Sequence, residues 1–195
     1  MADRVVAEIK ASGREAAASY DNVSTVVGGE NILKTALAAF GQVDILVNNA
    51  GILRDKTFAK MSMADFRLVL DVHLMGAAIC SQAVWATMRA QRFGRIVMTT
   101  SSSGLYGNFG QANYGAAKMA LVGLMQTLAI EGAKDGIRVN CLAPTAATRM
   151  TEGLLPPPVL EKLRPEAVTP ALLHLVSDDA PTRAIVCAGA GTFER

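Results

Sequence analysis

Apolar positions along the chain follow two periods that alternate from one end to the other. In the first ten residues they recur with the helical period of about 3.6, and Ser12-Gly13 ends this pattern as a C-terminal cap would. A second helix is predicted over 24–40 and is closed by Gly41. The amino-terminal part of the chain is therefore expected to be helical.

Short continuous apolar runs lie between the helical patterns and predict buried strands. They cover 15–20, 43–47, 95–99, 137–142 and 184–188. Further helices are predicted from Ser62 to Arg89, over 111–134, and as one or two short helices within 159–176. The first of these opens with the capping-box spacing of Ser62 and Asp65. Strict alternation of helix and strand predicts an α/β fold, with a doubly wound parallel sheet of Rossmann type.

Composition narrows the class of protein. A chain of 195 residues with 51% hydrophobic content suits one domain over 1–195, and we find no internal repeat. The 19 basic and 17 acidic residues give a net charge of +2 without a basic patch, so we expect no nucleic-acid partner. Apolar stretches such as 119–125 fall well short of the roughly 20 residues of a membrane span. We expect a protein that has no membrane contact.

The three cysteines are too few and too scattered for a disulfide framework or a metal cluster. The first residues also lack a basic region followed by an apolar core, the mark of a secretory signal. We therefore expect a reducing cytoplasm as the location and no metal site.

The strongest chemical signal is Tyr114-x-x-x-Lys118 within the helix predicted over 111–134. Four residues along a helix bring two side chains onto one face, with Cβ atoms about 5–6 Å apart. Three consecutive serines, 101–103, follow the strand at 95–99, which places hydroxyl groups at the carboxyl end of a strand. Doubly wound folds bind their ligands at this end of the sheet.

A phenol, a hydroxyl and an ammonium at one strand end suit proton transfer to or from a substrate oxygen. The ordinary pKa of tyrosine, about 10, is too high for a base at neutral pH. Lowering it by about three units requires stabilising the phenolate by roughly 4 kcal/mol, more than a solvated lysine provides. We therefore expect Tyr114 and Lys118 to share a site that contains little water.

Four motifs in this order resemble the short-chain dehydrogenase/reductase family. They are Asn48-Asn49-Ala50-Gly51 after a strand, the serine cluster, Tyr114-x-x-x-Lys118, and Pro144-x-x-x-Thr148 after the next strand. The resemblance extends from position 2 to about position 191. It implies a dehydrogenase that transfers a hydride between a secondary alcohol or ketone and NAD, with NADP as the alternative cofactor.

The resemblance also implies roles for single residues. Tyr114 matches the catalytic acid and base, and Lys118 matches the residue that lowers its pKa and binds the nicotinamide ribose. Ser101, thirteen positions before Tyr114, matches the hydroxyl that orients the substrate, and Ser102 and Ser103 are the alternatives.

Cofactor contacts are implied at six further positions. Asn48, Ala50 and Gly51 resemble the turn beneath the cofactor. Pro144 and Thr148 match the family motif that follows the strand at 137–142. Asp21 resembles the acid near the adenine, although an acid after a strand is as often a helix cap.

His73 occupies the helical position at which the family usually has an asparagine that feeds a water-mediated proton relay to the lysine. It is either a helix histidine with satisfied partners or a member of the catalytic set. The second interpretation matches the dehydrogenase domains of peroxisomal-type multifunctional beta-oxidation enzymes, which the sequence also resembles around Gly51 and Tyr114. That resemblance implies a (3R)-3-hydroxyacyl-CoA substrate, with Arg54, Lys56 and Lys60 either binding its phosphates or simply solvated.

Three hypotheses for function stay open at this point. The first is the hydroxyacyl dehydrogenase, the second is a 3-ketoacyl reductase that uses NADPH, and the third is a catalytically inert family member that acts through association. Relatives usually pair through helices that correspond to 62–89 and 111–134, so we expect a homodimer or homotetramer.

A glycine-rich turn between the first strand and first helix normally receives the pyrophosphate of a dinucleotide. We find no such turn, so the first βαβ unit of the Rossmann-type sheet is expected to be lacking. In the family's strand order, the two strands of this unit lie between the strands at 15–20 and 43–47. We expect a longer native chain, a second chain that supplies the strands, or a rearranged sheet.

Overall fold

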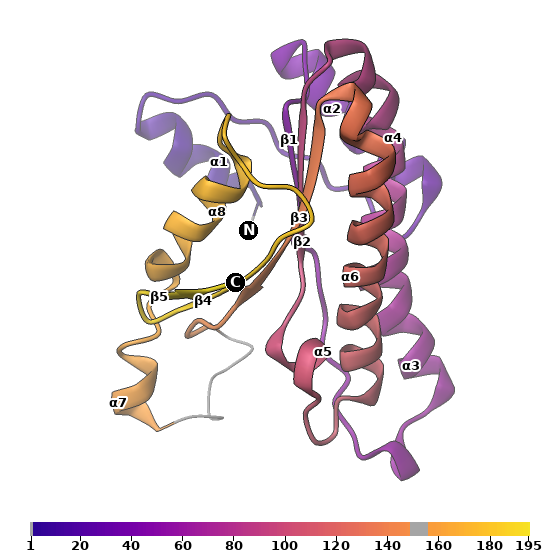
Figure 1. Ribbon diagram of the computed structural model, residues 1–195, viewed down its shortest axis with the longest axis vertical. Coiled ribbons are helices and arrows are strands. Elements are labelled where there is room, and N and C mark those ends of the chain that lie inside the picture. The colour runs from indigo at the N-terminus through magenta and orange to yellow at the C-terminus, as the bar shows by residue number, and fades with distance from the viewer. Residues whose placement is uncertain (1, 149–155) are drawn as a thin grey trace.

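The computed structural model describes residues 2–148 and 156–195 and contains one five-stranded sheet (Figure 1). The strands are β1 (Ile45–Asn48), β2 (Gly94–Thr99), β3 (Ile137–Pro144), β4 (Ile185–Gly189) and β5 (Thr192–Glu194). They lie in sequence order across the sheet, with β1 to β4 parallel and β5 antiparallel to β4. The predicted parallel α/β sheet is confirmed, and β1 is its edge.

Helices cover both faces of the sheet. On one face α4 (Gly76–Gln91) and α6 (Ala112–Gly132) pack on β1, β2 and β3, and α2 (Val26–Phe40) packs on α4. On the other face α8 (Thr169–Val176) packs on β2 and β3 (Figure 1). Shorter helical segments connect these elements. They are α5 (Ser102–Tyr106), α7 (Pro157–Leu160), η1 (Phe58–Lys60), η3 (Ala133–Asp135) and η4 (Pro165–Val168).

The core lies on the two faces of the central strands, because all six residues of β2 are buried. On the side of α4 and α6 the fully buried side chains include Met88, Ile96, Met98 and Met125. On the side of α8 they include Val97 and Leu175. A strand that is buried on both faces has consecutive apolar residues, which is why the strand at 95–99, with Ile96, Val97 and Met98 in its middle, was recognisable in the sequence.

The predicted helix from Ser62 to Arg89 is confirmed, with one irregularity. It begins as α3 (Met63–Leu70), continues through a π-helical segment, η2 (Asp71–Met75), and ends as α4. The Ser62 Oγ accepts the Asp65 backbone N–H at 3.0 Å, as the capping-box spacing predicts. This run, Met63–Gln91, is also long and apolar enough to cross a membrane by length and composition alone. Its contacts with α2, α6, β1 and β2 are those of a core helix.

The strand predicted at 15–20 is wrong. These residues follow helix α1 (Ala2–Ala11) as extended backbone outside the sheet, and β1 has no neighbour on its outer side within the described ranges. A strand forms only where a neighbour pairs with its backbone groups, and none lies beside this segment. Strand β5 was not predicted; its hairpin turns at Gly191, whose φ of 77° is left-handed.

Candidate active site

The candidate site lies at the carboxyl ends of β1 and β2, where the first turns of α6 approach the sheet. Asn48 ends β1, Ser101 follows β2, and Tyr114 and Lys118 lie on one face of α6. Parallel strands present their carboxyl ends at the same edge, so the motifs predicted from the sequence converge there.

Lys118 is buried, with 3% of its surface exposed, and its Nζ donates a hydrogen bond to the Thr99 carbonyl at 2.5 Å. The Thr100 hydroxyl donates to the Lys118 carbonyl at 2.7 Å, which fixes α6 against the end of β2. Burial lowers the pKa of Lys118 to about 8. The site therefore holds an ammonium that is only modestly favoured over the neutral amine at neutral pH.

Tyr114 has a pKa above its usual value, because burial disfavours the phenolate. The Ser101 hydroxyl opposes this effect, while the Asp55 carboxylate adds to it. The implied lowering of this pKa by Lys118 is not found. The Nζ lies 5.4 Å from the centroid of the tyrosine ring and directs a hydrogen bond to Thr99 instead. In this state Tyr114 is a phenol at neutral pH and is able to donate a proton.

Ser101 is the serine that interacts with the Tyr114 phenol. It is the N-cap of α5, and its Oγ accepts the Ser103 backbone N–H at 3.2 Å, which fixes the side chain. Ser102 is exposed on the first turn of α5. The geometry thus favours Ser101 over the two alternatives, although its catalytic role stays a prediction.

His73 lies in the π-helical segment η2 and is 3% exposed. Its Nε2 is 3.1 Å from the Ile52 backbone nitrogen and 2.8 Å from the Ile52 carbonyl oxygen, so one tautomer accepts from the N–H and the other donates to the oxygen. Its Nδ1 is buried with no hydrogen-bond partner among the described residues. Burial, followed by the charge of Lys118, lowers the pKa of His73 to about 4.

The His73 ring contacts Tyr114 edge to face, with ring centroids 5.2 Å apart. It also packs directly against Gly51, where an added Cβ would lie 2.4 Å from the His73 Cε1. The interpretation of His73 as a helix histidine with satisfied partners is therefore wrong. Its Nδ1 has no hydrogen-bond partner among the described residues, and its ring lies against the Tyr114 phenol. π-Helical segments occur frequently at functional sites, and this one places the His73 ring against Tyr114; its catalytic role stays a prediction.

A hollow of about 120 Å³ opens beside these residues and is lined by Asn48, Ala50, His73 and Lys118, among others. The Asn48 side chain donates to the Ser81 hydroxyl at 3.0 Å and so holds the turn after β1 in place. A buried ammonium beside exposed backbone of this turn fits the ribose of a nicotinamide nucleotide, which offers hydroxyl groups as acceptors.

The pyrophosphate half of such a nucleotide has no comparable cradle in the part of the chain that is described. Two adjacent glycines, Gly28 and Gly29, lie in the first turn of α2, and both serve packing. An added Cβ at Gly28 would lie 1.9 Å from the Asn22 carbonyl oxygen, and one at Gly29 would lie 2.6 Å from the Ile79 side chain. The described residues thus fit the nicotinamide riboside half of the cofactor.

Three predicted cofactor contacts are not among the residues that line the hollow. Asp21 is exposed and accepts hydrogen bonds from Ser19 and Asn31, the second of which lowers its pKa most. It is not the cap of α2, since Thr25 has that role. Pro144 ends β3, and Thr148 lies four residues further, exposed, beside the residues that are not described. Their contacts with a cofactor stay predictions.

Two residues beside Tyr114 were missed by the sequence reasoning. Asn113 is fully buried and donates to the Arg54 carbonyl at 3.0 Å, and Gln111 donates to the Asp55 carboxylate at 2.7 Å. Polar residues in the first turn of a helix are common at solvent-exposed positions, so the sequence offered no signal for their burial.

Comparison with known proteins agrees with this arrangement. The family model of the short chain dehydrogenases matches residues 1–156. A putative short-chain type dehydrogenase/reductase of Mycobacterium tuberculosis is 54% identical over the whole chain, which spans 68% of that protein. The peroxisomal hydratase-dehydrogenase-epimerase of Saccharomyces cerevisiae is 56% identical over 91% of the chain, which spans only 19% of that longer protein.

Solved structures show the same relationship. A short chain dehydrogenase from Mycobacterium avium superimposes with a TM-score of 0.89 at 36% identity, covering 98% of this chain and 68% of its own. The peroxisomal multifunctional enzyme type 2 of Drosophila melanogaster gives a TM-score of 0.84 at 42% identity, covering 99% of this chain and 33% of its own. The family match, the mycobacterial relative and the converged Ser101, Tyr114 and Lys118 lead to one conclusion: this chain belongs to the short-chain dehydrogenase family of oxidoreductases.

Proposed function

We propose that this oxidoreductase interconverts a hydroxyl and a ketone at the third carbon of an acyl thioester, with a nicotinamide nucleotide as its cofactor. The observation that carries the proposal is the meeting of the Tyr114 phenol, the Ser101 hydroxyl and the buried Lys118 ammonium at the carboxyl ends of β1 and β2. Support for the substrate class comes from relatives named as hydratase-dehydrogenase-epimerases and from a 3-oxoacyl-[acyl-carrier-protein] reductase of Synechocystis at 42% identity.

The chain's own residues handle the proton. In the direction of ketone reduction, Ser101 hydrogen-bonds the substrate oxygen and Tyr114 donates its phenolic proton to that oxygen. In the direction of oxidation the same two groups act in reverse, with Tyr114 taking the hydroxyl proton. The nicotinamide, when bound, supplies or accepts the hydride. Lys118 and the turn at Asn48 to Gly51 would hold its ribose and ring.

The state of Tyr114 suits the first direction directly. Burial keeps the phenol protonated, and a donor must be protonated to act. Oxidation requires the phenolate, which burial disfavours because it raises the pKa of Tyr114 above its ordinary value. Additional positive charge beside the phenol is therefore needed for the oxidative direction, and the buried, water-poor surroundings strengthen the effect of any such charge.

The proposal is tested by following NADH and NADPH absorbance with acetoacetyl-CoA as the substrate. Tyr114→Phe removes the proton donor and should lower turnover at least about 100-fold while leaving the circular dichroism spectrum unchanged. Tyr106→Phe is the matched control, because Tyr106 is 82% exposed on α5 and has no lysine four residues on. Equal turnover of the Tyr114→Phe variant and the wild type would contradict the proposed role.

The same assay separates the rival functions. A clear preference for NADPH over NADH would favour the 3-ketoacyl reductase. The inert alternative is favoured by one observation, the lack of a glycine-rich cradle among the described residues. Calorimetric titration of the chain with NADH distinguishes it, because micromolar binding is incompatible with a protein that binds no nucleotide.

A further inference from the structure

The segment after the turn at Gly51, residues 52–56, runs beside Tyr114 and is bound to neighbouring elements at four of its five positions, all except Leu53. We call it the strap. Its first residue, Ile52, has both backbone groups within reach of the His73 Nε2, which hydrogen-bonds one of them in each tautomer. Its last, Lys56, donates its backbone N–H to the Gly110 carbonyl at 2.9 Å. The strap is therefore fixed both to η2 and to the loop that leads into α6.

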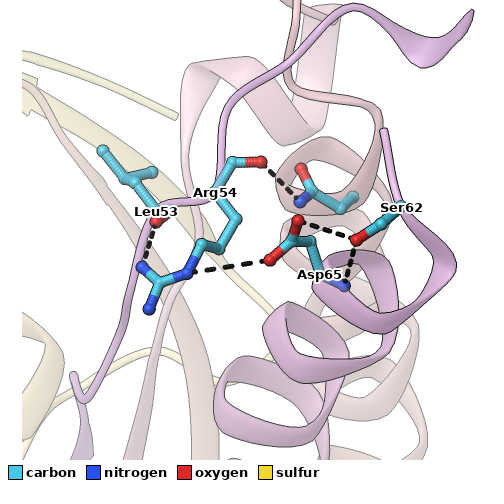
Figure 2. A network of polar contacts seen from close by, with 5 residues as sticks. Leu53, Arg54, Ser62 and Asp65 are labelled. Atoms are coloured by element: carbon cyan, nitrogen blue, oxygen red, sulfur yellow. Dashed lines mark hydrogen bonds and ion pairs between the residues drawn. The ribbon is translucent and has the colours of Figure 1, made fainter. Parts of the chain in front are cut away.

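Arg54 in the middle of the strap connects two helices, as Figure 2 shows. Its guanidinium lies 3.8 Å from the Asp65 carboxylate and also donates to the Leu53 carbonyl at 2.8 Å. Asp65 is itself held by Ser62 at the start of α3. This ion pair is half exposed and hence contributes little stability by itself, but it directs the Arg54 side chain toward α3.

The Arg54 carbonyl points the other way, toward α6, where the Asn113 Nδ2 donates to it at 3.0 Å. The Asn113 Oδ1 accepts the Tyr114 backbone N–H at 2.7 Å, one of the donors that a helix start leaves unpaired. Both ends of this amide are thus occupied, and the side chain is fully buried. Breaking either bond would leave a buried polar group without its partner, an expensive change.

Building on the proposed function, we infer that Asn113 is a positioning residue. It fastens the strap to the residue that carries the reacting phenol, so the wall of the site and the proton donor keep one fixed separation. His73 also contacts the strap and Tyr114, but it meets Tyr114 only through the ring, whereas Asn113 hydrogen-bonds both the strap and the Tyr114 backbone. Turnover depends steeply on such positioning, since a misplacement of about 1 Å costs up to about 100-fold in rate.

The decisive variant is Asn113→Asp. It keeps the shape of the side chain and its acceptor for the Tyr114 N–H, but at neutral pH it presents an oxygen to the Arg54 carbonyl instead of a donor. We expect kcat for acetoacetyl-CoA to fall about 10- to 100-fold with KM changed by less than about threefold. Burial raises the pKa of the introduced carboxyl, and once protonated it can donate again. Part of the lost kcat should therefore return as the pH is lowered toward 5.

Asn140→Asp is the matched control. Asn140 on β3 is equally buried, donates to the Pro181 carbonyl at 2.7 Å and accepts the Ala184 N–H at 3.0 Å, away from the candidate site. It should lower the melting temperature as much as Asn113→Asp, without a change in kcat or its pH profile. Equal losses of kcat in the two variants, or no recovery of the Asn113→Asp variant at low pH, would overturn the positioning role.

Hydrogen exchange supplies a readout that does not require turnover. In Asn113→Asp the backbone amides of Ile52 and Lys56 should exchange at least about tenfold faster, while those of β3 keep their protection. If the wild type has no turnover, the proposed reaction fails, and this exchange result alone decides whether Asn113 fastens the strap. Unchanged protection at both amides would refute it.

Discussion

Replacing Lys118 by methionine tests whether its ammonium is held in the folded chain against an unfavourable environment. The pKa of Lys118 is lowered from 10.5 to about 8 by burial, so folding favours the neutral amine. Its contribution to stability is complete above pH 10.5 and is lost as the pH falls through 8. The whole shift of about 2.5 pKa units corresponds to roughly 3 kcal/mol.

Only part of this shift is accessible in a convenient experiment. Between pH 7 and pH 9 the wild type should gain about 1.3 kcal/mol relative to Lys118→Met in the free energy of unfolding by urea. Burial raises the pKa of the neighbouring Cys141 thiol to about 12, so this thiol stays protonated in the folded protein over the range. At pH 7 the variant gains stability because it no longer buries a charge. It also loses the hydrogen bond to Thr99, and this loss offsets part of the gain. Equal pH slopes in the two proteins would refute the burial of a charged lysine.

Three further predictions concern the surroundings of the site and the sheet edge. His73 has a pKa of about 4 against an ordinary 6.5, so its contribution to stability is present above pH 6.5 and is lost as the pH falls through 4. In His73→Asn the free energy of unfolding by urea should therefore fall less steeply over this pH range. Gly51→Ala should cost about 1–3 kcal/mol of stability because its Cβ meets the His73 ring, whereas Gly123→Ala, with open space around it, should not destabilise. Ile45→Lys should reduce light scattering at high protein concentration, whereas Leu173→Lys on α8 should have less effect, since Ile45 lies on the open sheet edge.

Most of the fold was accessible from the sequence because its signals are local. The central strand at 95–99 has three consecutive apolar residues in its middle, and Ser62 with Asp65 marked the start of a helix. The strand predicted at 15–20 failed because strand formation depends on a partner that no local pattern reveals. The π-helical segment also left no local mark, although it decides where His73 lies.

The candidate site was predictable to the extent that its members stand in fixed motifs. Ser101, Tyr114 and Lys118 were located by spacing, and the structure brings them together. The state of Tyr114 was not predictable, because a pKa depends on burial and on where the Lys118 ammonium is directed. The role of Asn113 was equally hidden, since it requires the strap to fold back onto α6. Pairing of copies through α4 and α6 stays a prediction.

Strand β1 has the sequence of an interior strand in an edge position. Ile45, Leu46 and Val47 form a continuous apolar run, yet 46% of Ile45 and 37% of Val47 are exposed. Natural edge strands are usually protected by charges, prolines or bulges, and this one has none within those three residues. A flanking strand would pair the free backbone groups of β1.

The same strand ends at the hollow lined by Asn48, Ala50 and Lys118, where the nucleotide is proposed to bind. Within the described residues, the unpaired edge of the sheet thus lies beside the place where no cradle for a pyrophosphate is found. One strand–turn–helix unit placed beside β1 would supply both a partner for the edge and the cradle, because the turn after a strand at that position opens toward the hollow. We therefore expect nucleotide affinity and the protection of the β1 backbone amides against hydrogen exchange to rise together in any form of the protein in which that edge is paired. A form that gains one without the other would show that the two features are independent.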